Sequence, residues 1–353
     1  MKRIKLSYPK IVSLTLILIL FLTGCGNSST TTGAGNENTG SQAESLTIKL
    51  AGMTPPDHPL TVGAEKFKEL VEKKSEGKIK VELYPNLQLG AIREQTEQVQ
   101  LGTIHMTQTL LSTVTSFNAE TLQVFEYPFL WPNNEDKIWE VLSGEAGTKA
   151  LDHLEAVKFK GFGFWAGGFK SMTSKGDPIL TPSDLSGKNM RVIPSEILIK
   201  TYETYGANPV PIEFAELYNA LQQGVVDAQE NPLETISSNK LYEVQDHLSI
   251  TEHGYQFYMI VANLDWFNGL SPEFQQIIME SEEESRIYAR DLTQEMSDTR
   301  IKEFPELGLE VHTLSEEQRN EFVELSLPLH EEFSNTPEKK ELLEIIYKEL
   351  GIQ

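Results

Sequence analysis

The chain has 353 residues, of which 39% are hydrophobic and 23% charged, enough for two domains with a buried core. Its formal net charge of −22 argues against nucleic-acid binding and against a basic membrane-binding surface, which both need clustered positive charge. The single cysteine, Cys25, excludes an internal disulfide and a cysteine-built zinc site, and the seven histidines show no ligand-type spacing. We therefore expect no metal cofactor and no other cofactor, and an oxygen-ligand calcium site is the alternative. An anionic ligand would need local positive charge in its own site.

The N-terminus is typical of an export signal. Four basic residues precede a short apolar run at residues 11–22, which is too short to span a bilayer comfortably. The run ends in Leu22-Thr23-Gly24-Cys25, which resembles the lipobox of bacterial lipoproteins. Residues 1–24 are thus predicted to be a lipoprotein signal peptide, and Cys25 to carry lipid such as palmitate. The alternative is an uncleaved anchor with a chance cysteine.

Residues 25–44 are rich in glycine, serine, threonine and asparagine. Such a segment buries too little apolar surface to fold, so it is predicted to be a flexible tether. The predicted location is extracytoplasmic, with a lipid anchor in the cell membrane. Some anchored enzymes share this layout, so the tether alone does not decide the function.

The next segment alternates strand and helix patterns. Residues 46–51 and 79–83 alternate as strands do, and apolar residues recur at helical spacing between residues 60 and 71. A second helix is expected at 92–101. This order predicts an α/β architecture with crossover connections.

A similar order is expected later in the chain. Residues 188–193 are predicted to form a strand, and Ser195 to cap the helix that follows. Another helix ends at Gly224, a strand is expected at 225–229, and Asn231-Pro232 is expected to turn the chain.

Residues 271–304 have the pattern of a long acidic helix that Pro305 ends. Its length predicts that it bridges two lobes. The alternative is two helices separated by a kink.

The sequence predicts no enzyme. It contains no P-loop, no Gly-x-Ser-x-Gly elbow and no His-Glu-x-x-His motif. Gly161-x-Gly163-x-x-Ala166 matches the dinucleotide fingerprint, but it continues into Gly167-Gly168-Phe169, which favours strand and turn over a helix N-terminus.

Three sequence blocks carry a family resemblance. They are Trp165 to Lys170 (WAGGFK), Gly187 to Val192 (GKNMRV) and Gln222 to Pro232 (QQGVVDAQENP). In combination they closely resemble the DctP-like solute-binding proteins of tripartite ATP-independent periplasmic (TRAP) transporters. The resemblance covers nearly all of residues 46–350.

The resemblance implies a two-lobed periplasmic-binding-protein-like fold with hinge strands and a long lobe-bridging helix. Lobe I is expected at 45–168 and 256–296, lobe II at 169–255 and 297–353, and the ligand cleft between them. The implied function is capture of a small organic carboxylate, such as a C4-dicarboxylate, a 2-oxo acid or a sugar acid of the uronate type. The implied partner is the TRAP membrane permease.

Arg191 is the principal predicted ligand-binding residue. The family's arginine at this position pairs with the ligand carboxylate, and a guanidinium offers a planar fork of donors that matches a carboxylate. On its strand Arg191 points away from Met190 and Val192, near the carboxyl end, where open α/β sheets bind ligands. The alternative is a surface arginine in a salt bridge.

Three further residues are predicted to contact the ligand. The Asn231 amide can donate and accept, although an Asn-Pro turn is the alternative. The family places an aromatic residue over the ligand at Phe214, which could also pack in the core. Lys170 stands where the family often has a second arginine; lysine keeps the charge without the fork, and the alternative is a solvated surface lysine.

Three rival functions remain. One is a receptor of another transporter class, which takes sugars or amino acids. Another is a sensor partner of a signalling kinase. The third is an anchored enzyme that acts on a sugar acid.

Overall fold

The computed structural model of the protein describes residues 45–352. The predicted signal peptide, the tether and Cys25 lie outside the described residues. No helix between residues 45 and 352 is both long and apolar enough to cross a membrane.

The described strands form a ten-stranded sheet with the order β2-β1-β3-β9-β4-β7-β5-β6, and β8 and β10 join it beside β4. One part, which we call the β1 part, contains β2 (Ile79–Tyr84), β1 (Leu46–Ala51), β3 (Met106–Leu110), β9 (Tyr255–Asn263) and the beginning of β4 (Phe159–Ser174). Strand β1 runs parallel to β2 and β3, whereas β9 is antiparallel to β3 and β4. Mixed pairing of this kind confirms the predicted α/β class.

The β5 part of the sheet begins where β4 leaves β9. It contains the end of β4 together with β7 (Ala228–Pro232), β5 (Asn189–Val192), β6 (Asn208–Pro211), β8 (His247–Ile250) and β10 (Glu310–Thr313). Strand β5 runs parallel to both β6 and β7, so the carboxyl ends of these three strands lie at one edge.

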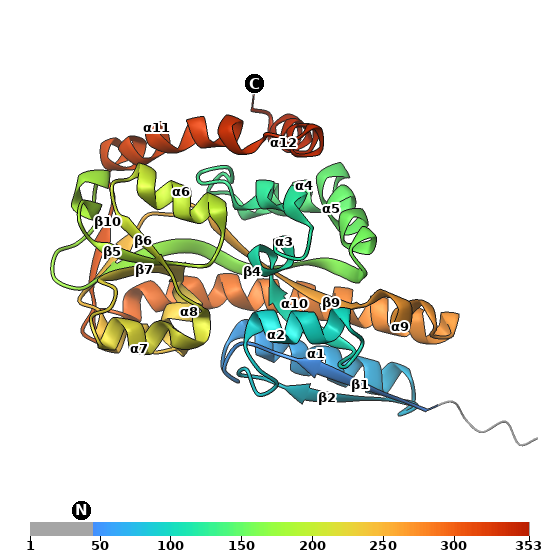
Figure 1. Ribbon diagram of the computed structural model, residues 1–353. Coiled ribbons are helices and arrows are strands. Elements are labelled where there is room, and N and C mark those ends of the chain that lie inside the picture. The colour runs from blue at the N-terminus through green and yellow to red at the C-terminus, as the bar shows by residue number, and fades with distance from the viewer. Residues whose placement is uncertain (1–44, 353) are drawn as a thin grey trace, which may run out of the picture. The chain divides into compact units, whose positions relative to one another are not determined.

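Strand β4 belongs to both parts of the sheet. Residues 159–169 pair with β9, whereas residues 170–174 pair with β7, and β8 pairs near the end (Figure 1). The register with β9 shifts between Ala166 and Gly168, and Gly168 has a φ of +99°, which favours glycine. Gly161 and Gly163 lie inside the same strand, so the fingerprint match does not open a helix.

Helix α10 (Pro272–Glu303) is one continuous helix of 32 residues, which excludes the alternative of two helices. It packs along β4 and contacts α1 (Pro59–Lys74) and α8 (Leu233–Ser238), as Figure 1 shows. Lys74 forms ion pairs with Glu280 and Glu284, and Arg300 pairs with Glu234. The helix therefore contacts elements of both parts of the sheet.

The remaining helices cover the sheet and connect its strands. They are α2 (Ile92–Gln100), α3 (Leu111–Thr115), α4 (Glu135–Leu142), α5 (Glu145–Ala156), α6 (Glu196–Thr204), α7 (Leu217–Gln222), α9 (Leu264–Asn268), α11 (Glu316–Phe333) and α12 (Pro337–Leu350). Short 3-10 turns lie at Glu120–Glu126 (η1), Pro182–Leu185 (η2), Phe214–Glu216 (η3) and Leu241–Val244 (η4).

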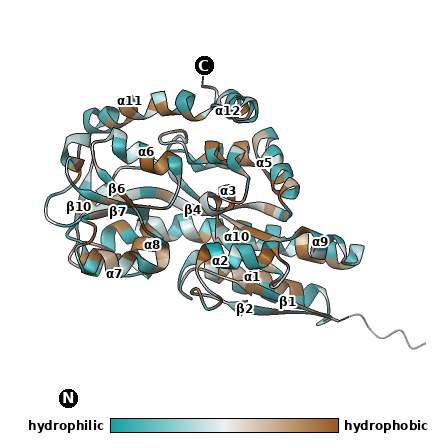
Figure 2. Cartoon of the chain, in the orientation of Figure 1, coloured by the Kyte–Doolittle hydropathy of each residue, from teal (hydrophilic) through white to brown (hydrophobic). Residues whose placement is uncertain are grey.

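The apolar core has two clusters. The larger contains Phe125, Trp131 and Phe257, and the smaller contains Leu221, Ile236, Leu248 and Phe304 among others. The outer helices carry both hydrophilic and hydrophobic residues (Figure 2), as amphipathic helices over a sheet do. Half-buried Phe214 packs against both clusters, so it lies where the two meet.

The strand predicted at 225–229 and the turn predicted at Asn231-Pro232 were wrong. Strand β7 covers Ala228–Pro232, because α7 closes at Gly224 with a φ of +69° and Val225 remains 51% exposed in the turn. Asn231 and Pro232 are held in the strand by pairing with Ser171 and Lys170 of β4. Pro232 is the last residue of β7 and the N-cap of α8, which begins at Leu233.

Ser195 occupies the N-cap of α6 as predicted, but its side chain forms no capping bond. Its hydroxyl instead donates to Glu126 Oε2 at 3.5 Å.

Candidate functional site

Arg191 is buried on β5 with its side chain oriented by the chain that follows the strand. It is 1% exposed, and its Nε donates to the backbone oxygen of Ile212 at 2.9 Å. It forms no ion pair within the described residues, so the alternative of a surface salt bridge is excluded.

The Nη1 atom of Arg191 is buried and has no hydrogen-bond partner among the described residues. An unsatisfied buried donor costs roughly 1–3 kcal/mol, and more when it is charged. Burial lowers the pKa of the guanidinium to about 10, against the opposing effect of Glu230 and Glu213. Arg191 therefore remains positively charged at neutral pH and holds unused hydrogen-bonding capacity.

A small pocket adjoins Arg191. One side of it is lined by Arg93, Ser112 and Ser116, which lie in α2, in α3 and directly after α3, and these helices pack on β3 of the β1 part. The other side is lined by Arg191 and by Glu213 and Phe214, which follow β6 of the β5 part. Its volume is about 30 Å³, which is roughly the room that one water molecule needs.

Phe214 also lines a second pocket of about 160 Å³ together with Met53, Asn86 and Leu87. Phe214 thus separates two pockets that both lie between the two parts of the sheet. A larger pocket of about 510 Å³ lies between η1, α6 and α12, and none of the four predicted ligand residues lines it.

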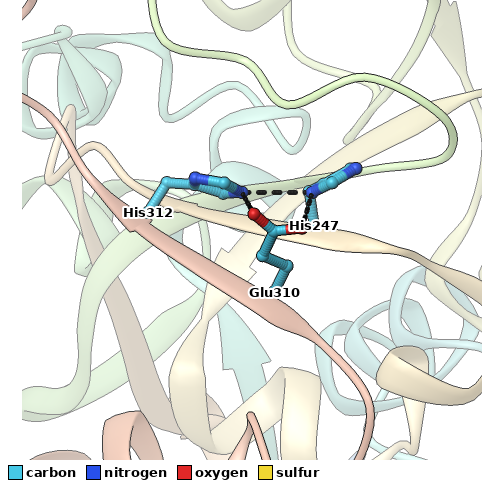
Figure 3. Close-up of side chains that lie close together, drawn as sticks. All are labelled: His247, Glu310 and His312. Carbon is cyan, nitrogen blue, oxygen red and sulfur yellow. Dashed lines mark hydrogen bonds and ion pairs between the residues drawn. The ribbon is translucent and has the colours of Figure 1, made fainter.

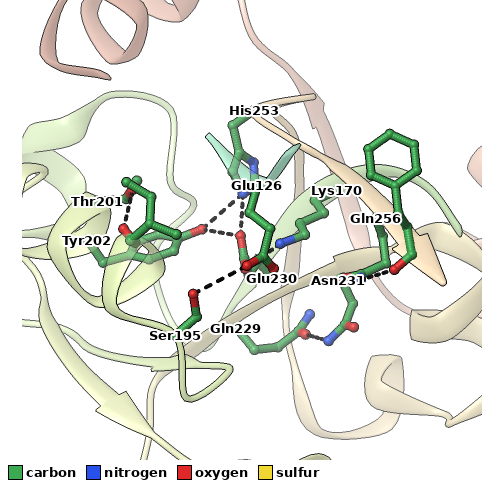
Figure 4. A network of polar contacts seen from close by, with 12 residues as sticks. Glu126, Lys170, Ser195, Thr201, Tyr202, Gln229, Glu230, Asn231, His253 and Gln256 are labelled. Atoms are coloured by element: carbon green, nitrogen blue, oxygen red, sulfur yellow. Dashed lines mark hydrogen bonds and ion pairs between the residues drawn. The ribbon is translucent and has the colours of Figure 1, made fainter. Parts of the chain in front are cut away.

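Lys170 is buried in an ion pair rather than solvated. It is 5% exposed, and its Nζ lies 3.0 Å from Glu230 Oε1. The other Glu230 oxygen accepts a hydrogen bond from the Tyr202 hydroxyl at 2.9 Å and contacts Nε2 of His253 at 2.5 Å. Figure 4 shows Lys170, Tyr202 and His253 converging on the Glu230 carboxylate.

This network keeps Glu230 ionised. Burial alone would raise its pKa, but Lys170 and His253 hold the pKa of Glu230 well below its usual range. Because an ionised carboxylate only accepts hydrogen bonds, Nε2 of His253 carries a proton. In the neutral ring, Nδ1 then accepts from the Thr251 hydroxyl, 2.6 Å away.

A second carboxylate, Glu126, lies close to this network (Figure 4). Burial raises the pKa of Glu126 to about 7, and the charges of Lys170 and Glu230 act on it in opposite directions. Glu126 is therefore harder to ionise at neutral pH than a free carboxylate.

Asn231 faces the opposite side of β7 from Glu230, because successive strand residues alternate. Its amide donates to the Gln229 side chain, whose own amide donates to Thr173 Oγ1 at 2.9 Å. Asn231 is 5% exposed and lies in a chain of buried polar side chains.

The structure places three of the four predicted ligand residues on adjacent strands. Lys170 is on β4, Asn231 on β7 and Arg191 on β5, and Phe214 lines the pocket beside Arg191. Sequence reasoning missed Tyr202, Glu230 and His253, and also Glu126 and Arg93. Glu230 lies inside the quoted QQGVVDAQENP block, and strand alternation would have placed it on the face opposite Asn231.

A two-part α/β fold with a buried, partly unpaired arginine between the parts is typical of a solute-binding protein. Residues 50–336 match the family described as bacterial extracellular solute-binding protein, family 7, also called DctP. The chain belongs to this family, whose members serve TRAP transporters.

Individual relatives match over most of their length. The C4-dicarboxylate-binding periplasmic protein DctP of Rhodobacter capsulatus is 35% identical over 83% of this chain and 87% of its own. The sugar acid binding protein DctPAm of Advenella mimigardefordensis, solved with galactonate, is 29% identical with a TM-score of 0.83 and covers 87% of this chain and 99% of its own. A TRAP solute-binding protein of Sulfurospirillum deleyianum, solved with succinate, is 29% identical with a TM-score of 0.81 and covers 85% and 98%.

Lys170→Met should destabilise the protein by about 3–5 kcal/mol, because it leaves the buried Glu230 charge without its main partner. The double variant Lys170→Met/Glu230→Gln should recover most of this loss, since no buried charge then lacks a partner. Urea unfolding at neutral pH measures each free energy of unfolding.

The matched control is Lys66→Met. Lys66 lies 2.9 Å from Glu69 in an exposed pair on α1, and its loss should cost less than about 1 kcal/mol. Equal unfolding midpoints for Lys170→Met and Lys66→Met would contradict a strongly coupled buried pair.

Proposed function

We propose that this protein is a lipid-anchored receptor of a TRAP transporter that binds a small organic carboxylate outside the cell and delivers it to the membrane permease. The observation that carries the proposal is the Arg191 guanidinium, which is buried, oriented by Ile212 and has an Nη1 without a partner among residues 45–352. A carboxylate is the natural partner for such a group, because two parallel hydrogen bonds satisfy both the charge and the free donors.

Local charge supports an anionic ligand in an acidic protein. The net charge of −22 repels anions at long range, so the attraction has to come from buried groups such as Arg191. Lys170 contributes little net charge, because Glu230 neutralises it.

The number of positive and negative side chains around Arg191 favours a ligand with a single carboxylate. Three cations, Arg191, Arg93 and Lys170, lie in or near the pocket, and the nearby carboxylates are Glu213, Glu230 and Glu126. Burial raises the pKa of Glu126 to about 7, so its charge counts for less than the other two. A monoanion therefore comes close to balancing the site, whereas a dianion leaves it negative. We propose a sugar acid as the ligand class, since its hydroxyls also match buried polar groups such as Asn231 and Gln229.

The relatives are known with both kinds of ligand, so the choice is testable. Thermal-shift screening of the full chain should show larger stabilisation by galactonate and other sugar acids than by succinate, because only a ligand that binds the native state raises its stability. The same screen includes 2-oxo acids, amino acids and neutral sugars. Stabilisation by amino acids or sugars alone would favour a receptor of another transporter class.

Rival functions give different outcomes. Turnover of the bound compound would identify an anchored sugar-acid enzyme, and binding without uptake by permease-containing cells would favour a sensor partner.

Arg191→Ala should weaken binding of the best ligand by about 30- to 3000-fold. This range corresponds to the roughly 2–5 kcal/mol lost when one partner of a buried charged pair is removed. Arg191→Lys should recover only part of the loss, because an ammonium cannot form the planar fork. Titration calorimetry measures the dissociation constants.

The control for this series is Lys200→Ala, which removes a positive charge from α6, where Lys200 lies 3.8 Å from Glu332 on the surface. Its affinity should equal that of the unaltered protein. If folded Arg191→Ala binds within about threefold of the unaltered protein, Arg191 is not the carboxylate partner.

We further propose that residues 45–168 with 256–296 and residues 169–255 with 297–353 act as two lobes that close on the ligand. The pocket beside Arg191, at about 30 Å³, is too small for a sugar acid, so the ligand has to enter a more open state. A ligand that contacts both parts shifts the population toward the closed state. Gly168, where β4 passes from one part to the other, is a natural hinge position.

Ligand should therefore reduce the radius of gyration measured by small-angle X-ray scattering. At a ligand concentration about tenfold above the dissociation constant of the unaltered protein, Arg191→Ala should compact much less, because a variant weakened by about 30-fold or more is at most about a quarter occupied there. An identical profile of the unaltered protein with and without saturating ligand would indicate a preformed, rigid site.

Lipid attachment at Cys25 is the remaining part of the proposal, and it rests on the Leu22-Thr23-Gly24-Cys25 sequence. Cys25→Ala should appear in the medium or retain its signal peptide, whereas the unaltered protein should fractionate with membranes. Mass spectrometry of the N-terminal peptide should show a diacylglyceryl cysteine. A soluble, processed protein without lipid would contradict the anchor.

A further inference from the structure

Two histidines and a glutamate meet on the surface of the β5 part, away from the four predicted ligand residues. Strands β8 and β10 pair in parallel, with Glu310 opposite His247 and His312 opposite Ser249. Residues two apart on a strand share a face, so Glu310 and His312 lie on one side of β10, next to His247 on β8. Figure 3 shows the three side chains converging.

Each of the two imidazole nitrogens lies near the other and near a different oxygen of Glu310. Nδ1 of His247 is 3.1 Å from Nε2 of His312, and the Glu310 oxygens are 3.7 Å and 3.5 Å from these two nitrogens. Both imidazoles are mostly buried, whereas Glu310 is 67% exposed. The group therefore opens to solvent on one side.

The 3.1 Å between the two imidazole nitrogens is close to an edge of a zinc coordination polyhedron, and the three residues each offer one ligand atom within 4.8 Å of the others. Zn²⁺ binds histidine nitrogen and carboxylate oxygen at about 2.0–2.2 Å, which places tetrahedral ligand atoms roughly 3.3–3.5 Å apart. Two imidazole nitrogens and one carboxylate are also a common ligand set for this ion, with water in the open fourth position. We propose that His247, Glu310 and His312 form a binding site for Zn²⁺.

Neighbouring groups are compatible with a bound cation. The carboxylate of Asp246, next to His247, accepts hydrogen bonds from Lys175 Nζ at 2.6 Å and from the backbone amide of Gly176 at 2.9 Å. Its charge adds to the negative potential of an acidic protein, and it leaves the three proposed ligands free to meet the ion.

The same three contacts have a simpler explanation without metal. A proton shared between the two imidazoles gives one histidine–histidine hydrogen bond, and Glu310 then forms a weak, exposed ion pair. The two explanations make different predictions, because the stability of the protein depends on zinc only if the three residues bind the ion.

Zinc would link an edge strand to its only neighbour. Strand β10 pairs with β8 alone among the described strands and connects α10 to α11. Binding to the native state raises its stability by mass action, so the ion would hold β10, and with it the connection from α10 to α11, against β8. This inference does not depend on the proposed carboxylate ligand.

The test uses the full chain, purified without a histidine tag and stripped with a chelator. Zinc should bind with a stoichiometry of one strong site and raise the unfolding temperature. His247→Ala and His312→Ala should each weaken zinc binding by more than about tenfold, the lower end of what even outer-shell partners contribute. Glu310→Gln should weaken it as well.

His153→Ala is the matched control, because His153 lies on α5, outside the three-residue group. It should bind zinc like the unaltered protein, and all folded variants should keep their affinity for the carboxylate ligand. Co²⁺ provides an independent readout, since visible absorption bands of a tetrahedral site should appear in the unaltered protein and not in the double variant His247→Ala/His312→Ala. Zinc affinity that is the same in this double variant, or no strong binding at all, overturns the proposal.

Discussion

The site depends on keeping a charged arginine buried in a protein whose net charge is −22. Taking a guanidinium out of water costs several kcal/mol unless hydrogen bonds and opposite charges compensate. Ile212 supplies one bond, and Glu230 and Glu213 supply charge at a distance. Neither carboxylate forms an ion pair with Arg191 in the described structure, so the compensation is incomplete and Nη1 remains unpaired.

The sheet makes this arrangement possible. Arg191 and Glu230 lie on adjacent parallel strands, and Lys170 lies on the other side of β7, so Glu230 stands between two cations. Lys170 binds one Glu230 oxygen, while Tyr202 and His253 bind the other. Arg191 is in register with Gln229, so Glu230 points to the opposite face of the sheet and does not pair directly with Arg191. Its charge still offsets part of the cost of burying the guanidinium.

Much of the fold followed from local patterns. The strands expected at 46–51 and 79–83, helix α1 and the long helix α10 were predicted because alternation and helical spacing are local properties of the sequence, and β2 extends one residue further, to Tyr84. The β7 boundary was wrong for a physical reason: its residues carry no clear alternation, and the strand is fixed by pairing with Lys170 and Met190 on distant strands.

The site was predictable only in part. Arg191 and its neighbours stood out because a family resemblance pointed to them. The partners of Glu230 come from β4, α6 and the segment before β9, up to 60 residues away in sequence, and no local signal predicts such contacts. The same holds for His247 and His312, which are 65 residues apart and meet only because β10 pairs with β8.

A lysine at position 170 suits the hydrogen bonds around Glu230 better than an arginine would, although both carry the same charge. An arginine would present a fork that can take both oxygens of Glu230, in competition with Tyr202 and His253. Lysine instead makes a single contact at 3.0 Å and leaves the second oxygen to those two residues. Its compact ammonium keeps two further donors, and Glu126 lies close enough for the Lys170 charge to lower its pKa against the effect of burial. Glu126, Lys170, Glu230 and Arg191 therefore form one electrostatically connected group, in which Glu230 acts on both Glu126 and Arg191.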